Sequence, residues 1–135
     1  MRVGVPREIK PDEYRVGLPP TAVREYVNHG HEVLVEAGAG VGAGYADTAY
    51  VKAGARIVPD AEAVFSGAQM IVKVKEPQAV EWARLTKDHI LFTYLHLAPD
   101  PAQTEGLLAS GCAAIAYETV TDANGGLPLL APMSE

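Results

Sequence analysis

The chain has 135 residues, of which 48% are hydrophobic and 21% charged, and its formal net charge is −6. This is the size of one compact domain, and the composition is that of a globular protein rather than a disordered chain. Because the charge is negative, and because the chain shows no signal peptide and no apolar run long enough to cross a bilayer, we expect a cytoplasmic protein that binds neither nucleic acid nor membrane.

Six short apolar or β-branched runs alternate with helical patterns along the chain, and Gly, Pro or Asp stands at most of the junctions. Strands are expected at residues 2–5, 32–36, 56–58, 70–74, 90–94 and 113–116. This alternation is typical of β-α units built around a parallel sheet. The sequence therefore predicts a single α/β domain with a mostly parallel, Rossmann-like sheet and helices on both faces.

The helices expected between these strands have recognisable ends. The first is expected at residues 22–29, with Gly30 as its terminator. Asp47 and Asp60 are each expected to cap a short helix. The clearest start is at residues 100–103, Asp-Pro-Ala-Gln, which combines an N-cap carboxylate, a proline at the first helical position and a glutamine at the capping-box position.

Residues 38–43, Gly-Ala-Gly-Val-Gly-Ala, match a dinucleotide-binding fingerprint, and Asp60 follows at a suitable distance. In that motif, however, the helix begins within the glycines, so that its amides face the pyrophosphate. Here the first helix signal is Asp47, whose carboxylate would repel phosphate. We therefore interpret the segment as a flexible surface connection and expect no nucleotide on it.

Two lysines lie in Val-Lys-Val-Lys-Glu-Pro at residues 72–77. Side-chain alternation in a strand places Lys73 and Lys75 on one face, and Lys75 stands at the carboxyl end, where open α/β sheets bind ligands. The pattern fits an anion-binding site. It fits equally well a solvent-exposed edge strand that lysines protect from pairing.

Two further polar residues follow expected strands. His96 comes directly after residues 90–94, where an imidazole could act as a general acid or base, or could serve a purely structural role. Arg15, in the loop after the first strand, could hold a carboxylate bidentately or could pair with Asp12 or Glu13. No metal is expected, and the single cysteine, Cys112, is expected to pack as a small buried side chain.

Seven segments, taken together and in order, resemble the N-terminal domain family of alanine dehydrogenases and transhydrogenases, and nearest among these the alanine dehydrogenases. The resemblance covers the whole chain and rests on residues 1–10, 13–16, 30–40, 72–77, 91–98, 115–120 and 127–135. The main departure is Gly-Leu-Pro-Pro at residues 17–20, where the family has Ala-Leu-Thr-Pro. It puts in doubt only the local path of that loop.

The resemblance implies an oxidoreductase that catalyses the reversible, NAD-dependent oxidative deamination of L-alanine to pyruvate and ammonia. It implies that Arg15 and Lys75 bind the substrate, that His96 is the catalytic acid or base, that Met133 lines the substrate pocket and that Ser134 lies near the cofactor. In the family NAD is bound mainly by a second half, and the full-length enzyme is typically a homohexamer.

We accordingly expect residues 1–135 to be the N-terminal part of the catalytic, substrate-binding domain, without the NAD-binding domain and without turnover on its own. Two alternatives remain. One is the nucleotide-binding subunit of a transhydrogenase, against which residues 94–97 and 130–134 argue. The other is a non-catalytic module that binds small carboxylates or mediates oligomerisation.

Overall fold

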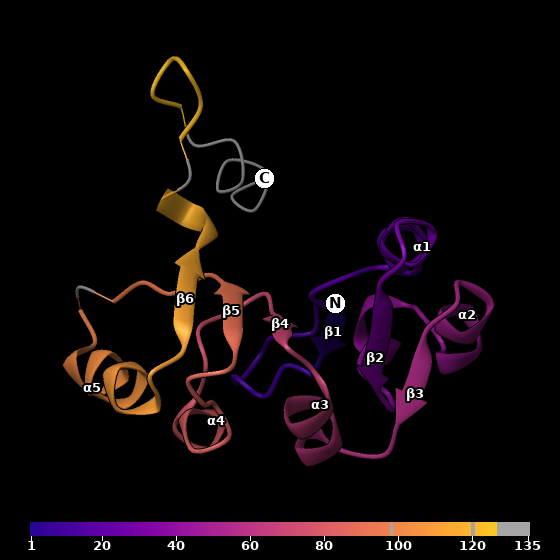
Figure 1. Ribbon diagram of the computed structural model, residues 1–135, viewed down its shortest axis with the longest axis horizontal. Coiled ribbons are helices and arrows are strands. Elements are labelled where there is room, and N and C mark those ends of the chain that lie inside the picture. The colour runs from indigo at the N-terminus through magenta and orange to yellow at the C-terminus, as the bar shows by residue number, and fades with distance from the viewer. Residues whose placement is uncertain (98, 120, 127–135) are drawn as a thin grey trace.

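The computed structural model describes residues 1–97, 99–119 and 121–126 (Figure 1). Its strands are β1 (Arg2–Val5), β2 (Glu32–Glu36), β3 (Arg56–Val58), β4 (Met70–Val72), β5 (Ile90–Thr93) and β6 (Ala113–Ala116). They form one sheet in the order β3-β2-β1-β4-β5-β6, and every neighbouring pair is parallel. The expected parallel sheet is confirmed, although β4 and β5 end earlier than predicted.

The helical elements alternate with these strands. They are α1 (Pro20–Asn28), η1 (Val41–Ala43), α2 (Asp47–Lys52), α3 (Ala61–Gly67), α4 (Ala79–Trp82), α5 (Pro101–Ser110) and η2 (Tyr117–Thr119). The short helix α4 was not predicted. Within the described residues, no helix has the length and hydropathy that a bilayer-crossing segment requires.

Alternate residues of the strands build a core on each face of the sheet. On one face, Val33 and Val35 of β2 pack with Val23 of α1 and Tyr50 of α2. On the other, Leu34 packs with the apolar side chains of α3, in a cluster that extends along the sheet to Leu107 of α5. The period of two in β2 therefore places helices on both faces, as expected.

The helix ends confirm some of the predicted caps and correct others. Asp60 accepts a hydrogen bond from the Ala63 amide at the start of α3, as predicted. Asp47 lies inside α2 rather than capping it, and its carboxylate accepts a bond from the Gly38 amide. Asp100 caps α5, whereas the Gln103 side chain does not close a capping box. Cys112 is half-buried against the second core rather than fully buried.

The strand order places the connections after β1, β4, β5 and β6 along one edge of the sheet. β1 lies between β2 and β4. The chain after β1 continues to β2 on one side, and the later strands, beginning with β4, are added on the other side. This is the switch point at which open α/β sheets bind ligands. The loop after β1 lies close against β4: a Cβ on Gly17 would be 2.5 Å from the Val72 carbonyl oxygen.

Candidate functional site

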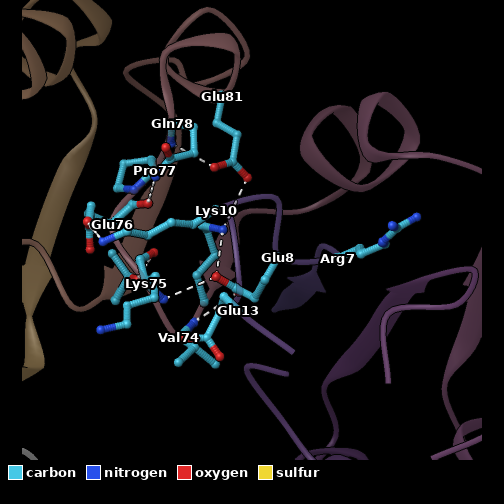
Figure 2. Close-up of polar contacts among 12 residues, drawn as sticks. Arg7, Glu8, Lys10, Glu13, Val74, Lys75, Glu76, Pro77, Gln78 and Glu81 are labelled. Atoms are coloured by element: carbon cyan, nitrogen blue, oxygen red, sulfur yellow. Dashed lines mark hydrogen bonds and ion pairs between the residues drawn. The ribbon is translucent and has the colours of Figure 1, made fainter. Parts of the chain in front are cut away.

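The loop after β1 is tied to the segment after β4 by Glu8. This carboxylate is buried and accepts hydrogen bonds from the amides of Val74 and Lys75, each at 3.1 Å. Figure 2 shows the Glu8 side chain directed at that segment, whereas Arg7 points away from it. Because backbone amides cannot change partners freely in a buried site, Glu8 fixes the path of the chain at Lys75.

Lys73 is enclosed by carboxylates. Its Nζ lies 3.1 Å from an oxygen of Glu8 and 3.1 Å from an oxygen of Glu81, and its side chain is 1% exposed. Burial raises the pKa of Glu8, and the charge of Lys73 and the bonds from the two amides oppose that rise. Lys73 is therefore a structural counterion in the interior, with no face open to a ligand.

The lysines do not share one face, so that prediction is wrong. The prediction relied on strand alternation up to residue 75, but β4 ends at Val72, so the alternation does not extend that far. The edge-strand alternative is also excluded, because β4 lies between β1 and β5. Lys73 turns to the carboxylates, and Lys75 turns to an aromatic ring.

Lys75 and His96 contact the same aromatic side chain. The Nζ of Lys75 lies 4.9 Å from the centroid of the Tyr94 ring, and the His96 ring stacks on Tyr94 at 5.5 Å with an interplanar angle of 17°. In the part of the chain that the structure describes, no carboxylate lies within ion-pair distance of Lys75. An ammonium with no carboxylate in contact and an exposed imidazole thus both lie against the Tyr94 ring.

Arg15 pairs with Glu13, which is the commoner of the two alternatives for this residue. Its Nε and Nη2 donate to the two Glu13 oxygens at 2.9 and 2.6 Å, and the Arg15 side chain is 47% exposed. These bonds lower the pKa of Glu13, and the positive charge of Lys75 lowers it further. Glu13 therefore lies in the field of both cations and links Arg15 to the neighbourhood of Lys75.

Tyr117 closes this region from the side of β6. Its hydroxyl donates to the Val74 carbonyl oxygen, and its ring lies 6.4 Å from that of Tyr94. Burial raises the pKa of Tyr117. Arg15 and Tyr117 line a hollow of about 450 Å³, together with Val74 and Phe92. Lys75 and His96 are not among the residues that line this hollow, so the structure brings these two side chains together at Tyr94 and places Arg15 in the neighbouring hollow. Cations, a histidine and an apolar wall are the kinds of group that bind and protonate a small carboxylate substrate.

Sequence reasoning missed the carboxylates that pair with Lys73 and the aromatic ring that contacts Lys75 and His96. Glu8, Glu81 and Tyr94 had no assigned role. For Glu81 a signal existed: Gln78 and Glu81 form a reciprocal capping box at the start of α4. The predicted pocket residue Met133 and cofactor neighbour Ser134 lie outside the described residues.

The glycine-rich segment does not have the geometry of a nucleotide site. The helix that follows it begins at Asp47, and the carboxylate of Asp47 occupies the amide of Gly38 at 2.9 Å. The segment is only partly a surface connection: Ala39 is buried and a Cβ on Gly40 would lie 2.6 Å from the Tyr50 ring, whereas residues 41–43 are exposed. The described residues also contain no group of three or more His, Cys, Asp or Glu side chains arranged to hold a metal ion.

Comparison with known proteins gives consistent matches. The family model described as alanine dehydrogenase/PNT, N-terminal domain, matches residues 4–135. Alanine dehydrogenases of Halomonas elongata and Mycolicibacterium smegmatis are 55% and 53% identical over 99% and 100% of this chain. In both cases the chain covers 36% of the relative, so it spans about a third of the length of these relatives.

Solved structures agree with the sequence matches. A structure of an L-alanine dehydrogenase superposes with a TM-score of 0.96 at 54% identity, over 99% of this chain and 37% of the other. A transhydrogenase from Sinorhizobium meliloti superposes with a TM-score of 0.81 at 29% identity, over 87% of this chain and 35% of the other. The chain therefore belongs to the alanine dehydrogenase/PNT N-terminal domain family.

Proposed function

We propose that this chain is the N-terminal, substrate-binding part of an NAD-dependent L-alanine dehydrogenase, a cytoplasmic homohexamer that interconverts L-alanine with pyruvate and ammonia. The observation that carries the proposal is the row formed by Lys75, Tyr94 and His96 at the carboxyl edge of the sheet. The similarity to alanine dehydrogenases over 99% of the chain supports it.

In this proposal Lys75 binds the carboxylate and neighbouring oxygen of pyruvate or alanine. Its ammonium contacts only the Tyr94 ring among the described residues, so a substrate anion need not displace a carboxylate. Arg15 supplies the second cation. Because Glu13 occupies its fork, Arg15 shares its donors with the substrate or exchanges Glu13 for it. Met133 would line the pocket.

His96 would move the proton. A histidine beside the reacting carbon can take a proton from the substrate nitrogen or oxygen and return it, and its ordinary pKa lies near neutral pH. Stacking on Tyr94 restricts the imidazole to one orientation, which is the property required of a positioned acid or base.

Residues 38–43 lack the geometry of an NAD site, because the Gly38 amide donates to the Asp47 carboxylate. Apart from Ser134, proposed to lie near the cofactor, the residues that hold it belong in this proposal to the remainder of the full-length protein. The transhydrogenase relative, at 29% identity over 87% of the chain, supports the second candidate, a transhydrogenase-like domain. Such a domain has no need of pyruvate.

The test is titration of the chain with pyruvate, followed by calorimetry or by the NMR signals of His96. We expect weak, saturable binding that Lys75→Gln reduces by roughly tenfold or more, since a charge-assisted hydrogen bond contributes about 1.5–3 kcal/mol. Lys52→Gln is the matched control, because Lys52 is an exposed lysine of α2 on another part of the molecule.

Equal loss of affinity in both variants would mean that pyruvate responds only to net charge, and the site assignment would be wrong. Absence of any pyruvate binding would favour the transhydrogenase-like alternative. Binding that survives in Lys52→Gln and fails in Lys75→Gln supports the proposed site.

A further inference from the structure

His96 has an unusual backbone conformation. Its φ is +49°, in the left-handed region that non-glycine residues seldom occupy. A residue in this conformation needs contacts that offset its cost in free energy, and such conformations are common at functional sites. The question is which contacts hold the peptide between Leu95 and His96.

Two side chains from different elements form hydrogen bonds with the backbone of Leu95 and His96. The Glu118 carboxylate, in η2, accepts hydrogen bonds from the Leu95 amide at 3.1 Å and the His96 amide at 3.0 Å. Gln103, fully buried in α5, donates its Nε2 to the Leu95 carbonyl oxygen at 2.7 Å. Two amides and the intervening carbonyl therefore have charged or buried partners.

These hydrogen bonds determine the direction of the His96 imidazole. With the His96 amide held, the ring of residue 96 returns over the ring of residue 94 and stacks on it at 17°. Without the carboxylate, the peptide can relax to an ordinary right-handed or extended conformation, which directs the side chain elsewhere. The stack therefore depends on Glu118 as well as on Tyr94.

We infer that Glu118 is a positioning residue for His96. It acts through the backbone of residues 95 and 96, sets the direction of the imidazole and leaves the cations at Arg15 and Lys75 unaffected. The kinetic part of this inference rests on the proposed function, because only a reaction at His96 would report the orientation as a rate. The geometric part does not.

The geometric test uses the ring-current shift that the Tyr94 ring imposes on the His96 ring protons. These protons are assigned by comparison with His96→Gln and measured in this chain by NMR. Glu118→Ala should move them to the values of an unstacked histidine. Glu118→Gln, which keeps one oxygen acceptor, should retain most of the shift. Glu118→Asp, which keeps the charge but is one methylene shorter, should lose it.

Glu36→Ala is the control, because Glu36 also accepts a bond from a backbone amide, that of Arg7, but on β2. It should leave the His96 signals unchanged. If Glu118→Ala fails to fold, the contrast between Glu118→Asp and Glu118→Gln still decides the matter. Retained shifts in both Ala and Asp variants would overturn the inference.

The kinetic test is made in the full-length polypeptide that carries this segment. A misdirected catalytic group lowers kcat, by roughly ten- to a hundredfold for a displacement of about 1 Å. Glu118→Ala should therefore lower kcat, leave the KM for pyruvate within about twofold and be largely rescued by Glu118→Gln. Unchanged kcat together with unchanged His96 shifts in Glu118→Ala would overturn the inference, whereas unchanged kcat with moved shifts would contradict the proposed catalytic role of His96. An inactive wild type with the expected NMR shifts would instead overturn the proposed function and leave the positioning role standing.

Discussion

The pKa values of two carboxyl groups near the lysines, Glu8 and Glu13, are shifted in opposite directions, although both residues lie in the loop after β1. Glu8 is buried, and burial raises its pKa above the ordinary value of 4.5. Glu13 is hydrogen-bonded by Arg15, and those bonds lower its pKa below 4.5. Desolvation dominates at the first position and charge-assisted hydrogen bonding at the second.

These directions predict opposite pH dependences of stability. A carboxyl whose folded pKa is raised contributes stability below pH 4.5 that is lost as the pH rises through the folded pKa. One whose pKa is lowered contributes stability above pH 4.5 that is lost as the pH falls through the folded pKa. The free energy of unfolding in urea should therefore be measured for wild type, Glu8→Gln and Glu13→Gln across the acidic range.

Subtracting each variant from wild type isolates the carboxyl that was removed. The difference for Glu8 should decrease with rising pH, and the difference for Glu13 should increase. Each variant serves as the control for the other, because both remove one carboxyl from the loop after β1. Slopes of the same sign would contradict the assignment of desolvation to one residue and hydrogen bonding to the other.

At the scale of elements, the strands could be predicted because each is marked by a sequence pattern only a few residues long. The β-branched run of β2 and the glycine at residue 30, which has φ +86°, are local signals of that kind. The four residues of α4 are too few for an amphipathic period, so only the capping box marked them. Local pattern thus sufficed for the elements that are long or sharply ended.

The candidate site was less accessible to sequence reasoning because its contacts join distant segments. The positions of Lys75 and His96 after strands could be predicted, since the carboxyl ends of parallel strands share an edge. Glu8 binds residues 65 to 67 positions away, and Glu118 binds residues 22 and 23 positions away. No pattern within a few residues indicates such partners, and the roles of the pocket residues themselves stay predictions.

The contact between α4 and α5 offers a test of packing. A Cβ on Gly106 of α5 would lie 2.5 Å from the Trp82 ring of α4. Alanine is favoured over glycine in a helix by about 1 kcal/mol, but here overpacking should outweigh that gain. Gly106→Ala should lower the free energy of unfolding by about 1–3 kcal/mol.

The control is the same substitution in a Trp82→Leu background, where the clash is removed. There Gly106→Ala should be neutral or stabilising, and the loss of the bond from Trp82 to the Pro77 carbonyl oxygen cancels between the two members of the pair. Equal destabilisation in both backgrounds would show that the ring of Trp82 is not what requires glycine. Urea unfolding of the four proteins completes the cycle.

For the whole molecule, the carboxyl edge of the sheet brings Lys75 and His96 to one aromatic ring, whereas the glycine-rich loop donates its Gly38 amide to Asp47. We therefore predict that this chain, given NAD and L-alanine, forms no NADH, because orientation of the nicotinamide against the substrate supplies a large part of the rate. Absorbance at the NADH band measures it, with a full-length relative as the positive control. Sustained NADH formation by the chain would contradict this prediction.

The position of β1 has a consequence for how the chain folds during synthesis. β1 leaves the ribosome before the other five described strands, yet among them it alone joins β2 and β3 to β4, β5 and β6. One edge can pair once Glu32 has emerged, but the other must wait until Met70. Between the emergence of β2 and that of β4, a nascent chain therefore carries an apolar strand with an open edge, and chaperone protection matters most in that interval.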